Sequence, residues 1–311
     1  MTTAFLFPGQ GSQAVGMGVA LADASAHARA VFDEVDEALG ENLFAIMCEG
    51  PADRLTLTEN AQPAIMANAI ATLRVLEREH GLDVAKRAAC VAGHSLGEYT
   101  ALCAAGALDL ATTARLLRTR GLAMQAATPV GIGAMAAIGV DWDQAVAVAA
   151  EAAQSEVCVA ANDNAPGQVV ISGHRAAVER AIAILKEQGV RRAMLLPVSA
   201  PFHCPLMQPA ADVMAEALAD AAMTSPCVTV YANITASPVS DPGEIKRLLV
   251  DQVTGAVRWR SSIVAMSAAG IDHFVEFGGK VLGGMVKKIV PDARVTSIVT
   301  MQDIDVLAKE I

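Results

Sequence analysis

Residues 88–98 read Ala-Ala-Cys-Val-Ala-Gly-His-Ser-Leu-Gly-Glu, a short apolar run that ends in a glycine-flanked serine. The apolar run predicts a buried strand, and the residues from 96 to 105 predict a helix. The pattern between them is G-x-S-x-G, in which small residues let the backbone turn sharply and lift a serine hydroxyl above the sheet edge. Backbone N–H groups at the helix N-terminus then point toward a developing oxyanion. We therefore expect Ser95 to be a nucleophile; the alternative is a serine that only caps the helix beginning at Leu96.

Strands and helices alternate on either side of this stretch. The run Ala4–Phe7 ends at Pro8-Gly9 and predicts another buried strand followed by a turn. Further strands are expected near 228–231, 273–276 and 294–299, and further helices at 27–39, 61–79, 109–127, 206–222, 243–252, 260–269 and 280–288. Short apolar strands separated by helices indicate an α/β fold with a mostly parallel sheet, covered by helices on both faces.

The rhythm changes between residues 131 and 198. Strand patterns at 134–140, 157–161, 168–172 and 193–198 enclose helical patterns at 142–153 and 176–188, and the run 162–167 predicts a turn between two strands. The order β-α-β-β-α-β is that of ferredoxin-like folds. We therefore predict a small α+β subdomain at 129–198, inserted in a large α/β domain made of residues 1–128 and 199–311.

The composition excludes several classes of protein. Of 311 residues, 53% are hydrophobic and 18% charged, so a sizeable core forms and disorder is not the main state. The net charge of −10 argues against nucleic-acid binding and against an anionic membrane surface. No stretch offers the roughly 20 apolar residues of a spanning helix, and the N-terminus lacks the pattern of a signal peptide. Six scattered cysteines without a C-x-x-C pair indicate reduced thiols in a cytoplasmic protein and no zinc site.

A nucleophilic serine needs a base, and the chain has six histidines. His203 is our candidate, because it lies in the proline-rich run 197–205, where the small subdomain returns to the large domain and a cleft is expected. His94 adjoins the serine but is expected to pack, since neighbouring side chains at a sharp turn diverge. No acidic residue stands out as a partner for His203, so a backbone carbonyl that orients the ring is an alternative to a third side chain. The competing interpretation of His203 is a structural histidine in a rigid loop.

An arginine interrupts an apolar helix face. Leu116, Leu117, Arg120 and Met124 follow helical spacing and share one face, so Arg120 lies on the stripe that faces the core. A buried guanidinium needs an anionic partner. One interpretation is an ion pair with a core carboxylate, and the other is a substrate carboxylate held bidentately. A hydrolase of neutral esters would not need this charge.

A glycine turn follows the first strand. Residues 7–14 read Phe-Pro-Gly-Gln-Gly-Ser-Gln-Ala and match G-x-G-x-x-A, the dinucleotide-binding fingerprint. That fingerprint also requires an acidic residue at the end of a second strand about 20 positions later, whereas Asp33 and Glu34 fall in a helical pattern. We interpret the match as a coincidence; the turn can instead supply a backbone N–H to an oxyanion hole.

Taken together, these segments resemble the malonyl-CoA:acyl carrier protein transacylase family. The resemblance rests on Phe7–Gln13, Thr58–Ala64, Gly93–Glu98, Arg120-Gly121 with Met124-Gln125, Ser199–His203, and Gln252 seven residues before Trp259. These segments extend over nearly the whole chain, and their combination is specific. The resemblance implies a hydrolase-like α/β core that carries the ferredoxin-like insert.

The resemblance also implies ping-pong acyl transfer. Ser95 would attack malonyl-CoA with His203 as base, and the phosphopantetheine thiol of acyl carrier protein would take the malonyl group from Ser95. In the family, backbone N–H groups matching Gln10 and Leu96 form the oxyanion hole. The residue matching Arg120 holds the malonyl carboxylate.

Two further residues take their expected roles from the same resemblance. The carbonyl of the residue matching Gln252 orients the histidine, which would explain the absent acid. Phe202 resembles the residue found in malonyl-selective members. One departure is visible: Gly278-Gly279-Lys280 is one residue shorter than the Gly-Pro-Gly-Lys run common in the family, which affects the expected loop shape.

The implied substrates are malonyl-CoA and carrier-bound phosphopantetheine, with no metal or redox cofactor. Fatty-acid synthesis is the expected pathway; a polyketide or malonate-decarboxylase system is an alternative. A serine thioesterase or esterase with the same Ser-His dyad is a competing function, and so is a non-catalytic carrier-binding module. One chain can hold every proposed group, so a monomer is possible.

Acyl carrier proteins are acidic, which makes the net charge of −10 a problem for docking. Residues 241–294 contain eight Lys or Arg and six Asp or Glu, so this segment is basic while the rest is acidic. A basic patch near the cleft can steer docking within a screening length of about 8 Å. The alternative is an ordinary solvated surface.

Overall fold

β1 (Thr3–Phe7) and β2 (Cys90–Gly93) lie at the centre of a six-stranded sheet in the computed structural model, which describes residues 1–198 and 200–310. The strand order is β10-β9-β1-β2-β7-β8, and neighbouring strands are parallel except for β7 and β8. The remaining strands are β7 (Thr229–Ala232), β8 (Ser237–Val239), β9 (His273–Phe277) and β10 (Arg294–Ile298). The predicted α/β fold with a mostly parallel sheet is confirmed.

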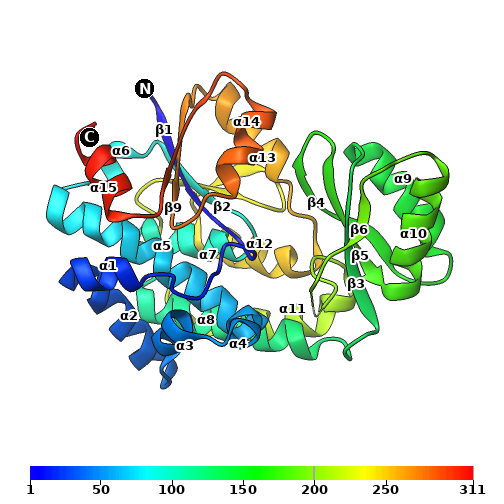
Figure 1. Cartoon of the computed structure of the whole chain (residues 1–311), viewed down its shortest axis with the longest axis horizontal. Coiled ribbons are helices and arrows are strands. Elements are labelled where there is room, and N and C mark those ends of the chain that lie inside the picture. The colour runs from blue at the N-terminus through cyan, green and yellow to red at the C-terminus, as the bar shows by residue number, and fades with distance from the viewer. Residues whose placement is uncertain (199, 311) are drawn as a thin grey trace.

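Helices pack on both faces of this sheet (Figure 1). Phe5 and Phe7 of β1 belong to one buried apolar cluster and Ala4 and Leu6 to another, as the alternation of side chains along a strand requires. The helices outside residues 129–198 are α1 (Val19–Ala24), α2 (Ala26–Leu39), α3 (Leu43–Glu49), α4 (Ala52–Thr56), α5 (Thr58–His80), α6 (Val84–Arg87), α7 (Leu96–Ala104), α8 (Leu110–Ala126), α11 (Gln208–Asp220), α12 (Pro242–Thr254), α13 (Trp259–Ala268), α14 (Leu282–Ile289) and α15 (Met301–Ala308), with a 3₁₀ turn, η1 (Pro205–Met207).

A second, four-stranded antiparallel sheet has the order β4-β5-β3-β6. Its elements are β3 (Gly133–Ile138), α9 (Trp142–Ala153), β4 (Cys158–Ala165), β5 (Gln168–His174), α10 (Arg175–Glu187) and β6 (Ala193–Leu195). It has its own apolar core, and α9 and α10 cover the face turned away from the large sheet (Figure 1). The ferredoxin-like order is confirmed. The boundaries at 128/129 and 198/199 stay predictions, and Ser199 lies outside the described residues.

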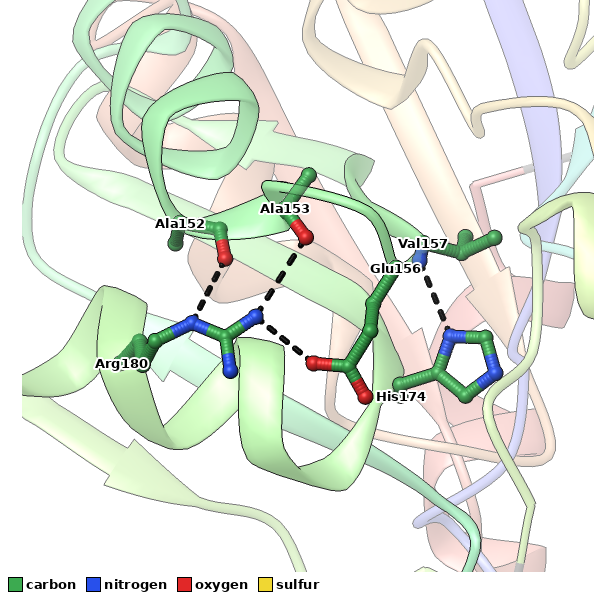
Figure 2. Close-up of polar contacts among 6 residues, drawn as sticks. All are labelled: Ala152, Ala153, Glu156, Val157, His174 and Arg180. Atoms are coloured by element: carbon green, nitrogen blue, oxygen red, sulfur yellow. Dashed lines mark hydrogen bonds and ion pairs between the residues drawn. The ribbon is translucent and has the colours of Figure 1, made fainter.

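Polar contacts connect α9, the segment just before β4, the end of β5 and α10 within this small unit (Figure 2). Arg180 of α10 donates to the carbonyl of Ala152 at 2.9 Å and forms an ion pair with Glu156 at 2.7 Å. His174 accepts a hydrogen bond at Nδ1 from the backbone N–H of Val157 at 2.9 Å. This histidine therefore has a structural contact that lies within the small unit.

The predicted turn at 162–167 is wrong in extent. β4 continues to Ala165, with register shifts after Ala160 and Asp163, and only Pro166 and Gly167 make the turn. Asn162 and Asp163 are buried because β4 meets the large unit here: the backbone N–H groups of Asp163 and Val257 donate to carbonyls on the opposite segment at 2.9 Å each. Tertiary contact thus overrides the turn propensity of these residues.

Several short elements were not predicted, and some predicted ends are misplaced. The missed elements are α1, α3, α4, α6, β8 and α15, each with at most eight residues. So few residues give too little periodicity to recognise, and such helices depend on the packing around them. Predicted strand 193–198 ends at Leu195, and predicted helix 61–79 begins earlier, at Thr58.

No helix among the described residues is both long and apolar enough to cross a bilayer. All six cysteines are free thiols.

Candidate functional site

Ser95 lies in the sharp turn between β2 and α7, with φ of 54° and ψ of −109°. The two flanking residues, Gly93 and Gly97, have no room for a side chain. A Cβ on Gly93 would lie 1.8 Å from the carbonyl oxygen of Gly97, and a Cβ on Gly97 would lie 2.2 Å from that of Phe7. The turn after β2 therefore packs directly against the end of β1, and only glycine fits at both positions.

The side chain of Asn233, just after β7, holds this strained turn from both sides. Its Nδ2 donates to the carbonyl of Gly93 at 2.7 Å, and its Oδ1 accepts from the backbone N–H of Ser95 at 2.7 Å. Positive φ at a serine costs about 1–3 kcal/mol and persists only where surrounding contacts hold it. Asn233 was not predicted as a site residue; its only signal in the sequence is a polar residue at the end of an apolar strand.

His203 faces the serine. Its Nε2 lies 2.8 Å from Ser95 Oγ, and its Nδ1 lies 2.8 Å from the backbone carbonyl of Gln252. Since a carbonyl can only accept, the proton is on Nδ1 and Nε2 is free to accept from the hydroxyl. Burial, followed by the charge of Arg120, lowers the pKa of His203 to about 3, so the ring is neutral at pH 7. A carbonyl stands where a third acidic side chain would otherwise be.

The other histidines of the large unit either contact other residues or are exposed. His94 Nε2 lies 2.8 Å from Asn164 Oδ1, and its ring packs against Trp259 with 5.6 Å between centroids, which agrees with the expected packing role. His273 bonds to Thr296, and His27 and His80 are exposed.

Arg120 of α8 is 1% exposed and points into the same site. Its Nη2 donates to Ser95 Oγ at 3.2 Å and to Gln252 Oε1 at 2.8 Å, and its Nη1 donates to Gln62 Oε1 at 2.8 Å. The guanidinium also lies 5.8 Å from the ring centre of Tyr99. Within the described residues no carboxylate oxygen lies within 4.0 Å of the guanidinium. The interpretation of Arg120 as the partner of a core carboxylate in a direct ion pair is therefore wrong. A buried cation with amide and hydroxyl partners is suited to receive an anion from outside.

Gln10 and Leu96 approach the serine from two turns. Leu96 is the first residue of α7, and Gln10 follows Gly9, whose Cβ position lies 2.7 Å from the carbonyl oxygen of His94. In the described part of the chain, neither backbone N–H donates to an acceptor. Two free donors beside a nucleophile are what an oxyanion requires.

A cavity of about 360 Å³ opens onto these groups, lined by Gln10, Ser95 and His203 among others. Phe202, 7% exposed, lines it too. Its apolar walls are formed by Met135, Val170, Leu196 and Val198 from the small unit, and by Val281, Leu282 and Met285 at α14; polar lining residues include Gln13, Thr56, His94, Asn162 and Asn164. A larger hollow of about 890 Å³ between α5 and α7 contains none of the candidate groups. The cavity at Ser95 is thus the candidate site, and it lies between the two units.

The short loop at Gly278-Gly279-Lys280 packs beside the first glycine turn. Gly278 has φ of 75°, and its Cβ position lies 2.7 Å from Ala69 Cα; that of Gly279 lies 3.0 Å from Pro8. Glu276 accepts from the first backbone N–H groups of α14 at 2.8–2.9 Å. The loop therefore joins α14 to the turn that carries Gln10.

Comparisons with known proteins agree with this geometry. A family model described as "Acyl transferase domain" matches residues 4–279. The chain is 46% identical over 289 residues to the malonyl CoA-acyl carrier protein transacylase of Escherichia coli K12, covering 92% of each chain. A crystal structure of acyl-carrier-protein-S-malonyltransferase from Bartonella henselae is 51% identical with a TM-score of 0.97, covering 100% of this chain and 99% of the other. A type II PKS acyl-carrier protein in complex with its malonyl-transacylase contains a chain that is 36% identical with a TM-score of 0.96, covering 100% of both.

Proposed function

The chain belongs to the malonyl CoA-acyl carrier protein transacylase family, and from this we propose that it transfers the malonyl group from malonyl-CoA to the phosphopantetheine thiol of acyl carrier protein. The transfer passes through an ester on Ser95. One observation carries the proposal: Ser95 Oγ lies between His203 Nε2, at 2.8 Å, and Arg120 Nη2, at 3.2 Å. The hydroxyl thus touches a base and a cation at once.

In the first half-reaction Ser95 Oγ attacks the thioester carbonyl and its proton passes to His203 Nε2. The carbonyl oxygen of the tetrahedral intermediate carries the negative charge and accepts from the N–H groups of Gln10 and Leu96. The carbon–sulfur bond then breaks, and the CoA thiolate leaves with the proton held by His203. The carbonyl of Gln252 keeps Nδ1 protonated throughout, so the ring stays in the productive tautomer.

In the second half-reaction the phosphopantetheine thiol repeats these steps on the malonyl ester. His203 takes the thiol proton, the sulfur attacks, and Ser95 leaves with that proton. Arg120 holds the malonyl carboxylate by two parallel hydrogen bonds and so fixes the acyl group. Phe202 lines the cavity and limits the space beside that group. These steps balance with side-chain and backbone groups alone, which supports a reaction without metal or redox cofactor.

Fatty-acid synthesis is the proposed pathway, as the similarity to the Escherichia coli transacylase supports. Service to a polyketide system is the second candidate, because a similar chain is known in complex with a type II PKS acyl-carrier protein. We further propose a cytoplasmic enzyme that works as a single chain, without nucleic-acid or membrane partners, in keeping with its net charge of −10.

Incubation with malonyl-CoA and no carrier tests the transfer mechanism. We expect CoA release to stop near one equivalent and the intact mass of the protein to rise by one malonyl group, which disappears when carrier protein bearing phosphopantetheine is added. Ser95→Ala should give neither signal. Continued CoA release without carrier would favour a thioesterase, and no acyl-enzyme at all would favour a non-catalytic carrier-binding module.

A further inference from the structure

A buried carboxylate lies beneath the candidate catalytic pair. Glu98 belongs to the first turn of α7 and is 2% exposed. Its Oε2 accepts from the backbone N–H of Asn233 at 3.0 Å and from Gln252 Nε2 at 2.7 Å. The two residues that hold Ser95 and His203 in place therefore both bond to Glu98.

The side-chain amide of Gln252 connects this carboxylate to Arg120. Its Oε1 accepts from Arg120 Nη2 at 2.8 Å, while its Nε2 donates to Glu98 Oε2. The amide orientation is unambiguous, because a guanidinium only donates and an ionised carboxylate only accepts. One amide thus separates a buried positive charge from a buried negative one.

The other buried carboxylates near the site have partners of their own. Asp163 forms an ion pair with Arg260 at 3.0 Å, and Glu276 accepts from backbone N–H groups of α14. Over residues 1–198 and 200–310, no Lys or Arg nitrogen lies within 4.0 Å of Glu98. Arg120 is the cation whose charge acts on Glu98, favouring its ionised form.

We propose that Glu98 is a positioning residue that serves as the resident counter-ion of Arg120, and that it takes up a proton when the malonyl carboxylate binds that arginine. This inference rests on the proposed function. Before substrate binds, and above neutral pH, Glu98 is mostly ionised and the pair carries one charge of each sign. A second carboxylate leaves an excess negative charge in a poorly solvated region. A proton from the buffer removes it by forming an O–H bond on Glu98, at Oε1, while Oε2 keeps its two N–H donors.

The titration behaviour of the surrounding groups supports this assignment. Burial raises the pKa of Glu98 to about 7, against the opposing effects of Gln252, Asn233 and Arg120. Among its titratable neighbours, burial raises the pKa of Tyr99 further above neutrality and lowers that of His203 to about 3. Burial also lowers the pKa of His94, and Arg120 stays protonated. Glu98 is therefore the group in this cluster that titrates near neutral pH.

The test is calorimetric titration of Ser95→Ala with malonyl-CoA and, as control, acetyl-CoA, which carries the same phosphates but no carboxylate. Two buffers of different ionisation enthalpy at pH 7.5 report the protons taken up on binding. We expect malonyl-CoA to take up about half a proton or more beyond acetyl-CoA. The Kd of malonyl-CoA should also rise by up to about tenfold per pH unit above neutrality, while that of acetyl-CoA stays level. In Ser95→Ala/Glu98→Gln the excess uptake should vanish.

The outcomes separate this inference from the proposed function. Tighter binding of malonyl-CoA than acetyl-CoA without excess proton uptake would overturn the counter-ion role alone. Equal affinity for the two thioesters would contradict the malonyl specificity itself. Excess uptake that persists in the double variant would assign the proton to another group and also overturn the inference. If the double variant does not fold, the comparison of the two ligands on Ser95→Ala still decides.

Discussion

His203 and Arg120 meet at Ser95 Oγ, and the charge of Arg120 acts on the imidazole. Each donates to or accepts from Ser95 Oγ, at 3.2 Å for Arg120 Nη2 and 2.8 Å for His203 Nε2. The guanidinium charge, second to burial, disfavours protonation of the imidazole. The proposed base is thereby kept in the form that can accept a proton, beside the cation that we propose to bind the malonyl carboxylate.

The lowered pKa of His203 predicts the acid side of the pH profile. With an ordinary pKa of 6.5, the fraction of neutral imidazole would fall about tenfold for each pH unit well below 6.5. With a pKa of about 3, the imidazole stays neutral to much lower pH. We therefore expect kcat/KM for malonyl-CoA to change by less than about twofold between pH 6.5 and pH 5.5, whereas a pKa of 6.5 would lower it about fivefold over the same interval. Stopped-flow release of CoA measures this rate, and an acid limb centred near 6.5 would contradict the lowered pKa.

Arg120→Ala should reduce kcat/KM for malonyl-CoA by about 100-fold, which corresponds to about 3 kcal/mol for a charge-assisted hydrogen bond. The value for acetyl-CoA should change far less, because acetyl has no carboxylate to hold. Arg120→Lys, which keeps the charge but not the planar fork, should fall between wild type and alanine. Parallel losses for both donors would mean that Arg120 only supports the fold.

At the scale of elements, the site depends on the junction of β2 with α7 and on the end of β7. Glycine at 93 and 97 lets α7 begin directly above the sheet, and Asn233 closes the turn from the neighbouring strand. Strands β1, β2 and β7 are adjacent and parallel, so their carboxyl ends bring these segments to one edge.

Asn233→Ala should destabilise the fold and slow acylation together. It leaves the Gly93 carbonyl and the Ser95 N–H without their buried partner, at about 1–3 kcal/mol each. Urea denaturation measures the free energy of unfolding, and CoA release measures kcat. The matched control is Asn42→Ala, which removes the cap of α3 far from the site; it should cost about 1 kcal/mol and leave kcat unchanged. A normal kcat in folded Asn233→Ala would show that the turn does not need this residue.

At the scale of the whole molecule, the candidate active-site cavity lies between two units, one with a mostly parallel sheet and one with an antiparallel sheet. α14 lines it from the large unit, and Lys287 and Lys288 near the end of α14 are exposed. With the oxygen and nitrogen of the Gln168 amide exchanged, the oxygen accepts hydrogen bonds from Lys288 at 2.8 Å and from Arg192 at 3.3 Å. Basic side chains from both units thus meet at Gln168, two residues from Val170 of the cavity wall, on a chain with a net charge of −10.

Reversing the charge of Lys287 and Lys288 should weaken the reaction with acyl carrier protein and leave the reaction with malonyl-CoA unchanged. In Lys287→Glu/Lys288→Glu we expect the KM of acyl carrier protein to rise and its salt dependence to weaken, while the rate of acylation by malonyl-CoA stays unchanged. Lys86→Glu/Lys309→Glu makes the same charge change near α6 and α15, at the far end of the molecule (Figure 1). An unchanged carrier KM in the first variant would remove the patch from the docking surface.

Local sequence was enough to predict the alternation of strands and helices, the serine turn, the buried arginine and the ferredoxin-like order. Each of these depends on neighbours a few residues away, such as the glycines beside Ser95 or the apolar stripe beside Arg120. The pairing of Ser95 with His203 could be inferred from chemistry, but its 2.8 Å distance joins positions 108 residues apart.

What the sequence could not determine are the contacts made by residues with no pattern of their own. Asn233 has no periodic or motif signal, and Glu98 ends the Gly93–Glu98 motif without any sign of its partners, yet these residues hold the turn and the amide of Gln252. β4 extends through Asn162–Asn164 only because the large unit supplies backbone partners there. These contacts form only because certain strand ends are neighbours in the sheet. The order of the strands is set by the burial of the whole core, which no short stretch of sequence determines.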